Sequence, residues 1–183
     1  MRPGSERKLP SGVVAVAGNA VDAASFADAV RPGETFVQLV GTPHPSPARA
    51  AEFRSVDLAS ARASMDNAAR ARVAHFVYVS VAQPAPAMHA YLAARAEAEA
   101  LLRATGLPAT ILRPWYVLGP GHRWPYLLVP MYRVAERIAA YREGALRLGL
   151  VTIGQMLEAL VRAVETAPGG VRVWGVPEIR GQA

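Results

Sequence analysis

The run His75-Phe-Val-Tyr-Val-Ser80 contains the clearest strand signal in the chain. Its centre is a short block of β-branched and aromatic residues, which is typical of a buried strand. A helical pattern from Arg49 to Arg72 precedes it, and an alanine-rich helical pattern from His89 to Thr105 follows it. A strand that is apolar on both faces must be covered on both sides. This order therefore predicts an α/β fold with a parallel sheet between layers of helices.

The alternation of strands and helices extends in both directions from this run. On the N-terminal side, the apolar pattern predicts strands over Val13–Ala17 and Thr35–Val40, separated by a helix over Asp22–Val30 with Asp22 as its N-cap. On the C-terminal side we expect further elements in the following order: a strand over 109–113, helices over 126–141 and 153–165, and a strand over 171–176.

The composition excludes several classes of protein. The 183 residues suffice for one domain with a sizeable core, without a stabilising disulfide or metal. The chain has no cysteine, which excludes disulfide scaffolds, thiolate metal sites and cysteine nucleophiles. The four histidines, at positions 44, 75, 89 and 122, are far apart, so we expect no metal site.

The charge and the apolar segments bear on partners and location. The formal charge is +6, but Lys8 is the only lysine and the arginines are spread along the chain, so we expect no nucleic-acid partner. The first ten residues lack the apolar core of a signal peptide, and no apolar stretch approaches the roughly 20 residues that span a bilayer. These features predict a cytoplasmic protein.

The ends of the predicted strands locate the candidate site. In open α/β sheets, ligands bind beyond the carboxyl ends of the strands. That rule points to four places: Gly18-Asn19, Gly41-Thr42, Ser80, and Pro114-Trp115-Tyr116.

Tyr91 and Arg95 add a chemical signal, because positions four apart share one face of a helix. A cation beside the phenol favours the phenolate and should lower the pKa of Tyr91. With Ser80 holding a substrate oxygen, the pair would form a general acid/base site. The alternative is that Tyr91 is a partly buried helix residue and Arg95 is solvated.

The motifs together resemble a known superfamily. The run 75–80, then Tyr91-Leu-Ala-Ala-Arg95, then Leu112-Arg-Pro-Trp-Tyr-Val-Leu-Gly-Pro-Gly121 resembles the extended and atypical short-chain dehydrogenases/reductases. The similarity is to NAD-dependent epimerase/dehydratase-like and NmrA-like proteins. It implies a three-layer Rossmann-like sheet over residues 1–121, with 122–183 as a C-terminal extension of the same domain.

The resemblance also implies site roles. Ser80, Tyr91 and Arg95 would be the catalytic set, with Pro114, Trp115, Tyr116 and Val117 at the nicotinamide of NAD(P). Gly41 and Thr42 would lie near the phosphates and ribose, and Gly18 and Asn19 near the adenine. The opening residues Arg2, Ser5, Arg7 and Lys8 suit a 2′-phosphate, which favours NADP slightly, or they are an ordinary basic terminus.

The sequence departs from the family pattern in several features, which include a short gap between Ser80 and Tyr91. Arg95 stands where the family has lysine, and Asn19 where it usually has aspartate. The glycine-rich loop that holds the pyrophosphate is not found, since Gly12, Gly18 and Gly33 lack its spacing. We therefore expect a sheet that is incomplete at its N-terminal side, without the first βαβ unit, as in a fragment of a longer protein.

These observations leave three functions open. The chain would be an NAD(P)-dependent oxidoreductase or nucleoside-sugar epimerase/dehydratase of unidentified small-molecule substrate, a non-catalytic NAD(P)-binding sensor or assembly subunit, or a truncated form that binds no dinucleotide. An exposed strand edge would favour pairing with a second chain, as in a homodimer. The apolar run Trp124–Tyr132 would pack in the core or a subunit interface, line a substrate pocket, or contact a membrane surface peripherally.

Overall fold

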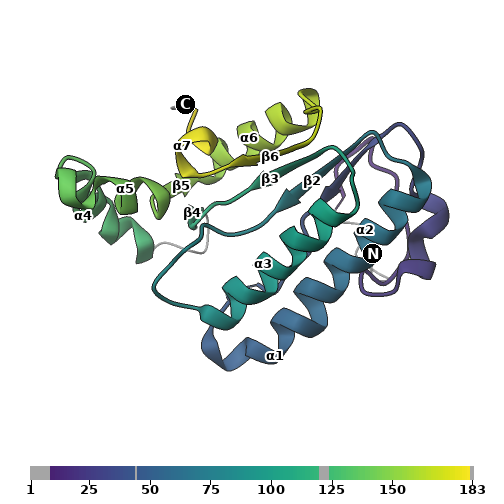
Figure 1. Ribbon diagram of the computed structural model, residues 1–183, viewed down its shortest axis with the longest axis horizontal. Helices are drawn as coiled ribbons and strands as arrows, with labels where there is room; N and C mark the ends of the chain where they lie inside the picture. Colours follow the sequence, from purple (N-terminus) through teal and green to yellow (C-terminus); the bar gives the residue numbers. More distant parts are fainter. Residues whose placement is uncertain (1–8, 44, 120–123, 182–183) are drawn as a thin grey trace.

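The computed structural model describes residues 9–43, 45–119 and 124–181 (Figure 1). Its main sheet has four parallel strands in the order β1-β2-β3-β6. The strands are β1 (Thr35–Gln38), β2 (His75–Val79), β3 (Ala109–Leu112) and β6 (Val171–Trp174). The predicted parallel α/β sheet is confirmed, and the predicted strand at 75–80 lies at its centre.

Helices cover both faces of the sheet, which gives the three predicted layers (Figure 1). On one face, Phe76 and Tyr78 of β2 pack against α2 (Ala59–Ala71) and α3 (His89–Ala104). On the other face, Val77 and its neighbours pack against α6 (Ile153–Glu165) and α7 (Val176–Ile179). Successive strand residues point to opposite faces, so the apolar run in β2 serves both cores.

The helical pattern predicted over 49–72 forms a series of helical segments. After a short 3-10 turn, η3 (Pro47–Arg49), the chain passes through α1 (Ala50–Glu52) and the wider π-helical turns of η4 (Phe53–Leu58) into α2. The wide turns bury Asp57 between Phe53 and Leu58 rather than leaving it on the solvent face. The segment ends at Arg72, which has a left-handed φ of 55°.

The predicted strand over Val13–Ala17 is wrong: this segment is irregular, and Val14 is 86% exposed. In the main sheet β1 pairs with β2, and residues 13–17 are not assigned to any strand. A short apolar run becomes a strand only when it joins the ladder of a sheet. Downstream, a 3-10 helix, η2 (Ala23–Ala29), takes the place of the predicted helix, and Asp22 caps it through Ala24 N as expected.

The C-terminal part differs from the prediction in detail. The single helix expected over 126–141 is instead η5 (Trp124–Leu128), α4 (Val129–Ala135) and α5 (Ala139–Arg147), because Ile138 takes an extended conformation between α4 and α5. Two short strands that the pattern did not indicate, β4 (Tyr116–Leu118) and β5 (Leu150–Thr152), pair in parallel. Three residues are too few to show a periodicity. α6 has the predicted bounds and begins with a capping box between Thr152 and Gln155.

Among the described helices, none has both the length and the apolar character needed to cross a membrane.

Candidate functional site

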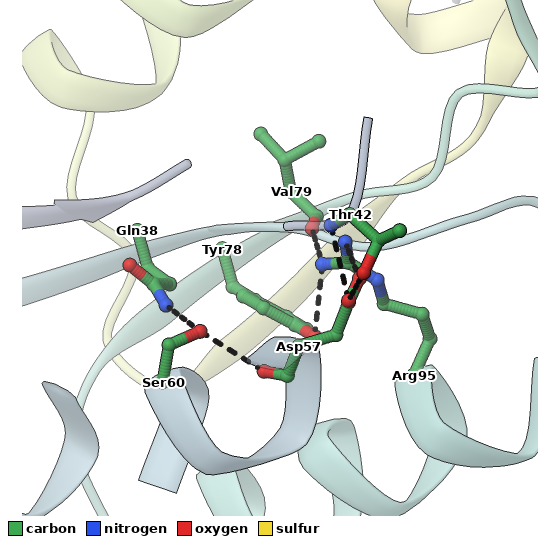
Figure 2. A network of polar contacts seen from close by, with 7 residues as sticks. All are labelled: Gln38, Thr42, Asp57, Ser60, Tyr78, Val79 and Arg95. Carbon is green, nitrogen blue, oxygen red and sulfur yellow. Dashed lines mark hydrogen bonds and ion pairs between the residues drawn. The ribbon is translucent and has the colours of Figure 1, made fainter. Parts of the chain in front are cut away.

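A buried ion pair between Asp57 and Arg95 lies at the carboxyl ends of β1 and β2 (Figure 2). Arg95 Nη2 is 2.6 Å from Asp57 Oδ1, and both side chains are almost fully buried. Asp57 comes from η4 and Arg95 from α3, so the pair joins two helical segments that are far apart in the sequence. A pair buried this deeply is stable only when further hydrogen bonds satisfy both charges.

Those further hydrogen bonds come from the strand ends (Figure 2). Arg95 Nη1 donates to the Val79 carbonyl oxygen at 2.9 Å and to the Tyr78 hydroxyl at 3.3 Å. Thr42 donates both its backbone N–H, at 3.0 Å, and its hydroxyl to Asp57 Oδ2. The structure therefore brings Thr42 and Arg95 together, but around a carboxylate of the protein itself.

At Gly41 the chain passes close to this pair. A Cβ at Gly41 would collide with the Arg95 guanidinium and lie 3.1 Å from Asp57 Oδ1. Any side chain here would push the ion pair apart. The sequence analysis expected Gly41 near the phosphates of the cofactor. In the structure, a glycine is needed at this position because the Arg95 guanidinium leaves no room for a side chain.

Tyr91 lies one helical turn before Arg95, as the spacing predicted. Its ring centroid is 5.0 Å from that of Phe53, and the Arg95 guanidinium carbon lies 5.1 Å from its centroid. Burial raises the pKa of Tyr91, and the opposing effect of Arg95 does not outweigh it. The expected lowering of the Tyr91 pKa is therefore reversed, because burial of the phenol outweighs the charge of Arg95 and the Asp57 carboxylate also raises the pKa.

Ser80 belongs to a second buried network, centred on Glu99 of α3. Ser80 Oγ donates to Glu99 Oε1 at 2.7 Å, and Gln83 Nε2 donates to the same oxygen at 2.8 Å. Arg113 approaches both carboxylate oxygens, at 2.9 and 2.6 Å, and Arg103 lies 3.2 Å from Oε2. Glu99 is 1% exposed, so this carboxylate is held entirely by protein groups.

The charge state of Glu99 decides what Ser80 can do. Burial raises the pKa of Glu99, but the hydrogen bonds from Arg113 and Ser80 outweigh it, and the pKa lies below its usual value. An ionised carboxylate accepts hydrogen bonds and cannot donate them. The Ser80 proton is thus directed to Glu99, and Ser80 Oγ is left with acceptor lone pairs only.

The segment Pro114–Val117 follows β3 and lies beside the residues after β2. The Pro114 carbonyl accepts a hydrogen bond from Ala82 N at 2.9 Å. Trp115 packs against the core beneath α6, and its ring centroid is 5.5 Å from that of Tyr116. Val117 is paired with Val151 in the β4–β5 ladder. This segment is thereby fixed next to Ser80, at the carboxyl end of the sheet.

Gly18 and Asn19 line a recess of about 1110 Å³ beside the free edge of β1. The Asn19 side chain accepts from Val21 N at 3.3 Å, and its backbone N–H donates to Ser25 Oγ at 2.8 Å, which shapes a tight turn. The recess is mainly apolar, with walls from residues of the 16–21 segment and from β1 and its continuation, including Val16, Val21, Leu39 and Val40.

The sequence analysis missed the two carboxylates that organise both networks. Asp57 lies in the middle of a predicted helix, and Glu99 lies two residues after the half-buried Glu97 on α3. The spacing Arg95-x-x-x-Glu99-x-x-x-Arg103 on one helical face was the available signal.

The following predicted residues lie outside the described parts of the chain: Arg2, Ser5, Arg7, Lys8, His44, Gly121 and His122. The described residues contain no cluster of side chains suited to hold a metal ion.

We expect Asp57→Asn to lower the free energy of unfolding by about 3–5 kcal/mol, because it leaves the Arg95 charge buried without a counter-ion. Denaturant unfolding at pH 7 would measure the loss. Glu52→Gln, which breaks the solvent-exposed pair with Arg49, is the control and should cost far less. Equal losses in the two variants would contradict the structural role of Asp57.

Glu99 predicts a specific pH dependence of stability. Its pKa in the folded protein lies below the usual value of 4.5, so its stabilising contribution is present above pH 4.5 and disappears as the pH falls through the folded pKa. We expect Glu99→Gln to be less stable than the wild type at pH 7 but to lose less stability on acidification below 4.5. Unfolding curves from pH 7 to 3 would show this, with Glu158→Gln on the exposed face of α6 as the control. A Glu99→Gln slope parallel to that of the wild type would contradict it.

The sequence and the fold were compared with those of known proteins. Residues 2–123 match the family described as NAD(P)H-binding. No similar sequence was found among the curated proteins. Among solved structures, the chain is similar to MoeE5 in complex with UDP-glucose and NAD, with 19% identity and a TM-score of 0.60 over 86% of this chain. It spans 64% of the length of MoeE5, which is less than two thirds.

Two further structures have the same fold. One is a short-chain dehydrogenase/reductase superfamily protein from Agrobacterium tumefaciens with bound NAD, with 18% identity, a TM-score of 0.63 and coverage of 90% of this chain and 66% of that one. The other is the Thermus thermophilus UDP-glucose 4-epimerase complex with NAD, also with 18% identity and a TM-score of 0.63, covering 98% of this chain and 70% of that one. The chain therefore belongs to the NAD(P)H-binding family and has the Rossmann-like fold of the short-chain dehydrogenase/reductase superfamily.

Proposed function

We propose that this chain forms the sheet and strand-end site of a protein that binds a nicotinamide dinucleotide without converting a substrate. The observation that carries the proposal is the buried Asp57–Arg95 pair. In the enzymes that the sequence resembles, the cation at this position holds the ribose and the tyrosine phenolate. Here its two terminal nitrogens are engaged by Asp57, Val79 and Tyr78.

The other two residues of the catalytic set support the same conclusion. Burial raises the pKa of Tyr91 above its usual value of 10, so the phenol is not activated as a general base at neutral pH. Ser80 donates its hydroxyl proton to Glu99, so it has no proton to offer to a substrate carbonyl in this arrangement. Hydride transfer is the chemistry that a bound nicotinamide supplies, but the proton donor and acceptor that would accompany it are engaged within the protein.

The recess beside Gly18 and Asn19 fits the adenosine end of the dinucleotide. Its volume suits a bound nucleotide, and apolar walls with a few polar groups are typical of ligand pockets. Asn19 can hydrogen-bond an adenine without adding a negative charge. The glycine-rich phosphate loop is not present in the sequence, so the phosphates receive fewer hydrogen bonds and we expect modest affinity.

The contact between Arg95 and Tyr91 favours a second candidate function, an NAD(P)-dependent oxidoreductase or sugar-nucleotide epimerase. The Arg95 guanidinium lies over the Tyr91 ring. Its charge offsets part of the rise in the Tyr91 pKa that burial causes, which is the direction in which an activating cation acts. The similar structures include epimerases, but at 18–19% identity they support the fold alone. This candidate requires Arg95 to exchange its contact with Asp57 for one with the phenolate when substrate binds.

The binding site is tested by filling the recess. We expect titration calorimetry to detect NAD⁺ and NADP⁺ binding to the wild type, and Val40→Trp to weaken it about tenfold or more because the indole occupies the adenosine volume. Leu157→Trp adds the same ring to an exposed site on α6 and should leave binding unchanged. Unchanged binding in Val40→Trp would rule out the recess. Absence of binding at millimolar concentrations would support the reading that this chain binds no dinucleotide.

Turnover distinguishes the two candidates. We expect no change in nicotinamide absorbance when the wild type and NAD(P)H are mixed with a panel of carbonyl compounds, and no interconversion of sugar nucleotides in the presence of NAD⁺. We also expect Tyr91→Phe to retain dinucleotide binding. Turnover by the wild type that is lost in Tyr91→Phe would establish the enzymatic candidate instead.

A further inference from the structure

The segment 126–147, called here the arm, stands apart from the sheet. It includes the end of η5 and both α4 and α5, and Figure 1 shows α4 and α5 at one end of the molecule, beyond the strands. α5 packs on α7, whereas α4 packs mainly on η5 and α5. One side of the arm is thus held to the body, and the other side faces solvent.

The arm exposes several large apolar side chains to solvent. Leu127 is 82% exposed, and successive exposed residues follow it at spacings of four, three, four and three. Met131 and Val134 share one side of α4, whereas Leu127 precedes α4 in η5, Ile138 lies between α4 and α5, and Tyr141 lies on α5. The members of this apolar stripe are Leu127, Met131, Val134, Ile138 and Tyr141.

The charges of the arm differ from those of the rest of the surface. Its two carboxylates are paired: Glu136 with Arg180 at 2.8 Å and Glu143 with Arg147 at 3.2 Å. Arg133, Arg137 and Arg142 are exposed, and within the described residues they have no acidic partner. The unneutralised charge beside the stripe is therefore entirely positive.

α6 offers an internal comparison. It also exposes apolar side chains, among them Leu157 and Val161. Its exposed carboxylates Glu158 and Glu165 have no cationic partner within the described residues, while Arg162 stacks on Trp174. The two surfaces share apolar character but differ in the sign of their free charge, so they should not favour the same partner.

We propose that the arm binds the surface of a bilayer that contains anionic lipids. The stripe would enter the boundary between headgroups and acyl chains, and the three arginines would contact headgroup phosphates. Tyr141 and the exposed Tyr126 suit the headgroup level. This surface is separate from the recess at Gly18 and Asn19, so the proposal does not depend on dinucleotide binding.

Two features of the arm favour a bilayer over a protein partner. The stripe does not follow one straight helix, because Ile138 is extended between α4 and α5, whereas a groove-binding or coiled-coil partner needs a continuous helical face. A two-fold pair of arms would also bring like-charged arginines together. A fluid lipid surface tolerates the break in the stripe and neutralises the arginines.

Co-sedimentation with vesicles tests the proposal. We expect the protein to bind phosphatidylcholine vesicles that contain about 30 mol% phosphatidylglycerol roughly tenfold or more tightly than pure phosphatidylcholine at about 0.1 M salt. The combined variant Arg133→Gln, Arg137→Gln and Arg142→Gln should lose the preference for phosphatidylglycerol. The pair Leu127→Ser and Met131→Ser should lose binding to both kinds of vesicle.

The matched control is the pair Leu157→Ser and Val161→Ser, which removes a comparable apolar surface from α6 and should bind like the wild type. Circular dichroism confirms that each variant is folded. Failure of the wild type to bind phosphatidylglycerol vesicles, equal binding to both compositions, or an equal loss in the α6 control would each overturn the proposal. Self-association by ultracentrifugation that disappears in the Leu127→Ser and Met131→Ser pair, without vesicle binding, would assign the arm to a second copy instead.

Discussion

The buried Asp57–Arg95 ion pair is the interaction on which the arrangement of the strand ends depends. It connects η4, α3, the end of β2 and the turn after β1 through a single set of hydrogen bonds (Figure 2). Moving two charges out of water costs several kcal/mol per ion, and only close, well-satisfied geometry offsets that cost. The close approach of Gly41 and both donors of Thr42 are parts of this geometry.

The Glu99 network repeats the same principle on the next strand. Its carboxylate gathers Ser80, Gln83, Arg113 and Arg103, so a second set of groups at the carboxyl end of the sheet is satisfied internally. Side chains that look catalytic in the sequence thereby stabilise the packing of α3 on the sheet. The same preorganisation that stabilises the strand ends reduces their readiness to exchange partners with a substrate, which is why we favour binding over turnover.

The pattern of the sequence predicts the layered part of the fold well. Long elements with strong periodicity, such as β2, α3 and α6, lie where the apolar pattern places them. The errors fall where local pattern carries little information. Val13–Ala17 has the composition of a strand but lies outside the sheet, and β4 and β5, which pair with each other, are too short to show a pattern in the sequence. The break at Ile138 interrupts a pattern that would otherwise suit one helix.

For the site, the sequence alone determined which residue types stand at the strand ends: Gly41 and Thr42 after β1, Ser80 after β2, and Tyr91 with Arg95 on one face of α3. It also predicted a parallel sheet, because apolar strands that alternate with helices can bury both faces in few ways. Only the tertiary structure decided where the polar side chains find their partners. Asp57 is 38 residues from Arg95 in the chain, and Ser80 is 19 from Glu99, and no local pattern encodes contacts over such separations. Burial then determined which partners Arg95 and Glu99 have, because a charge removed from water is stable only beside an opposite charge or hydrogen-bond partners that the packing brings close.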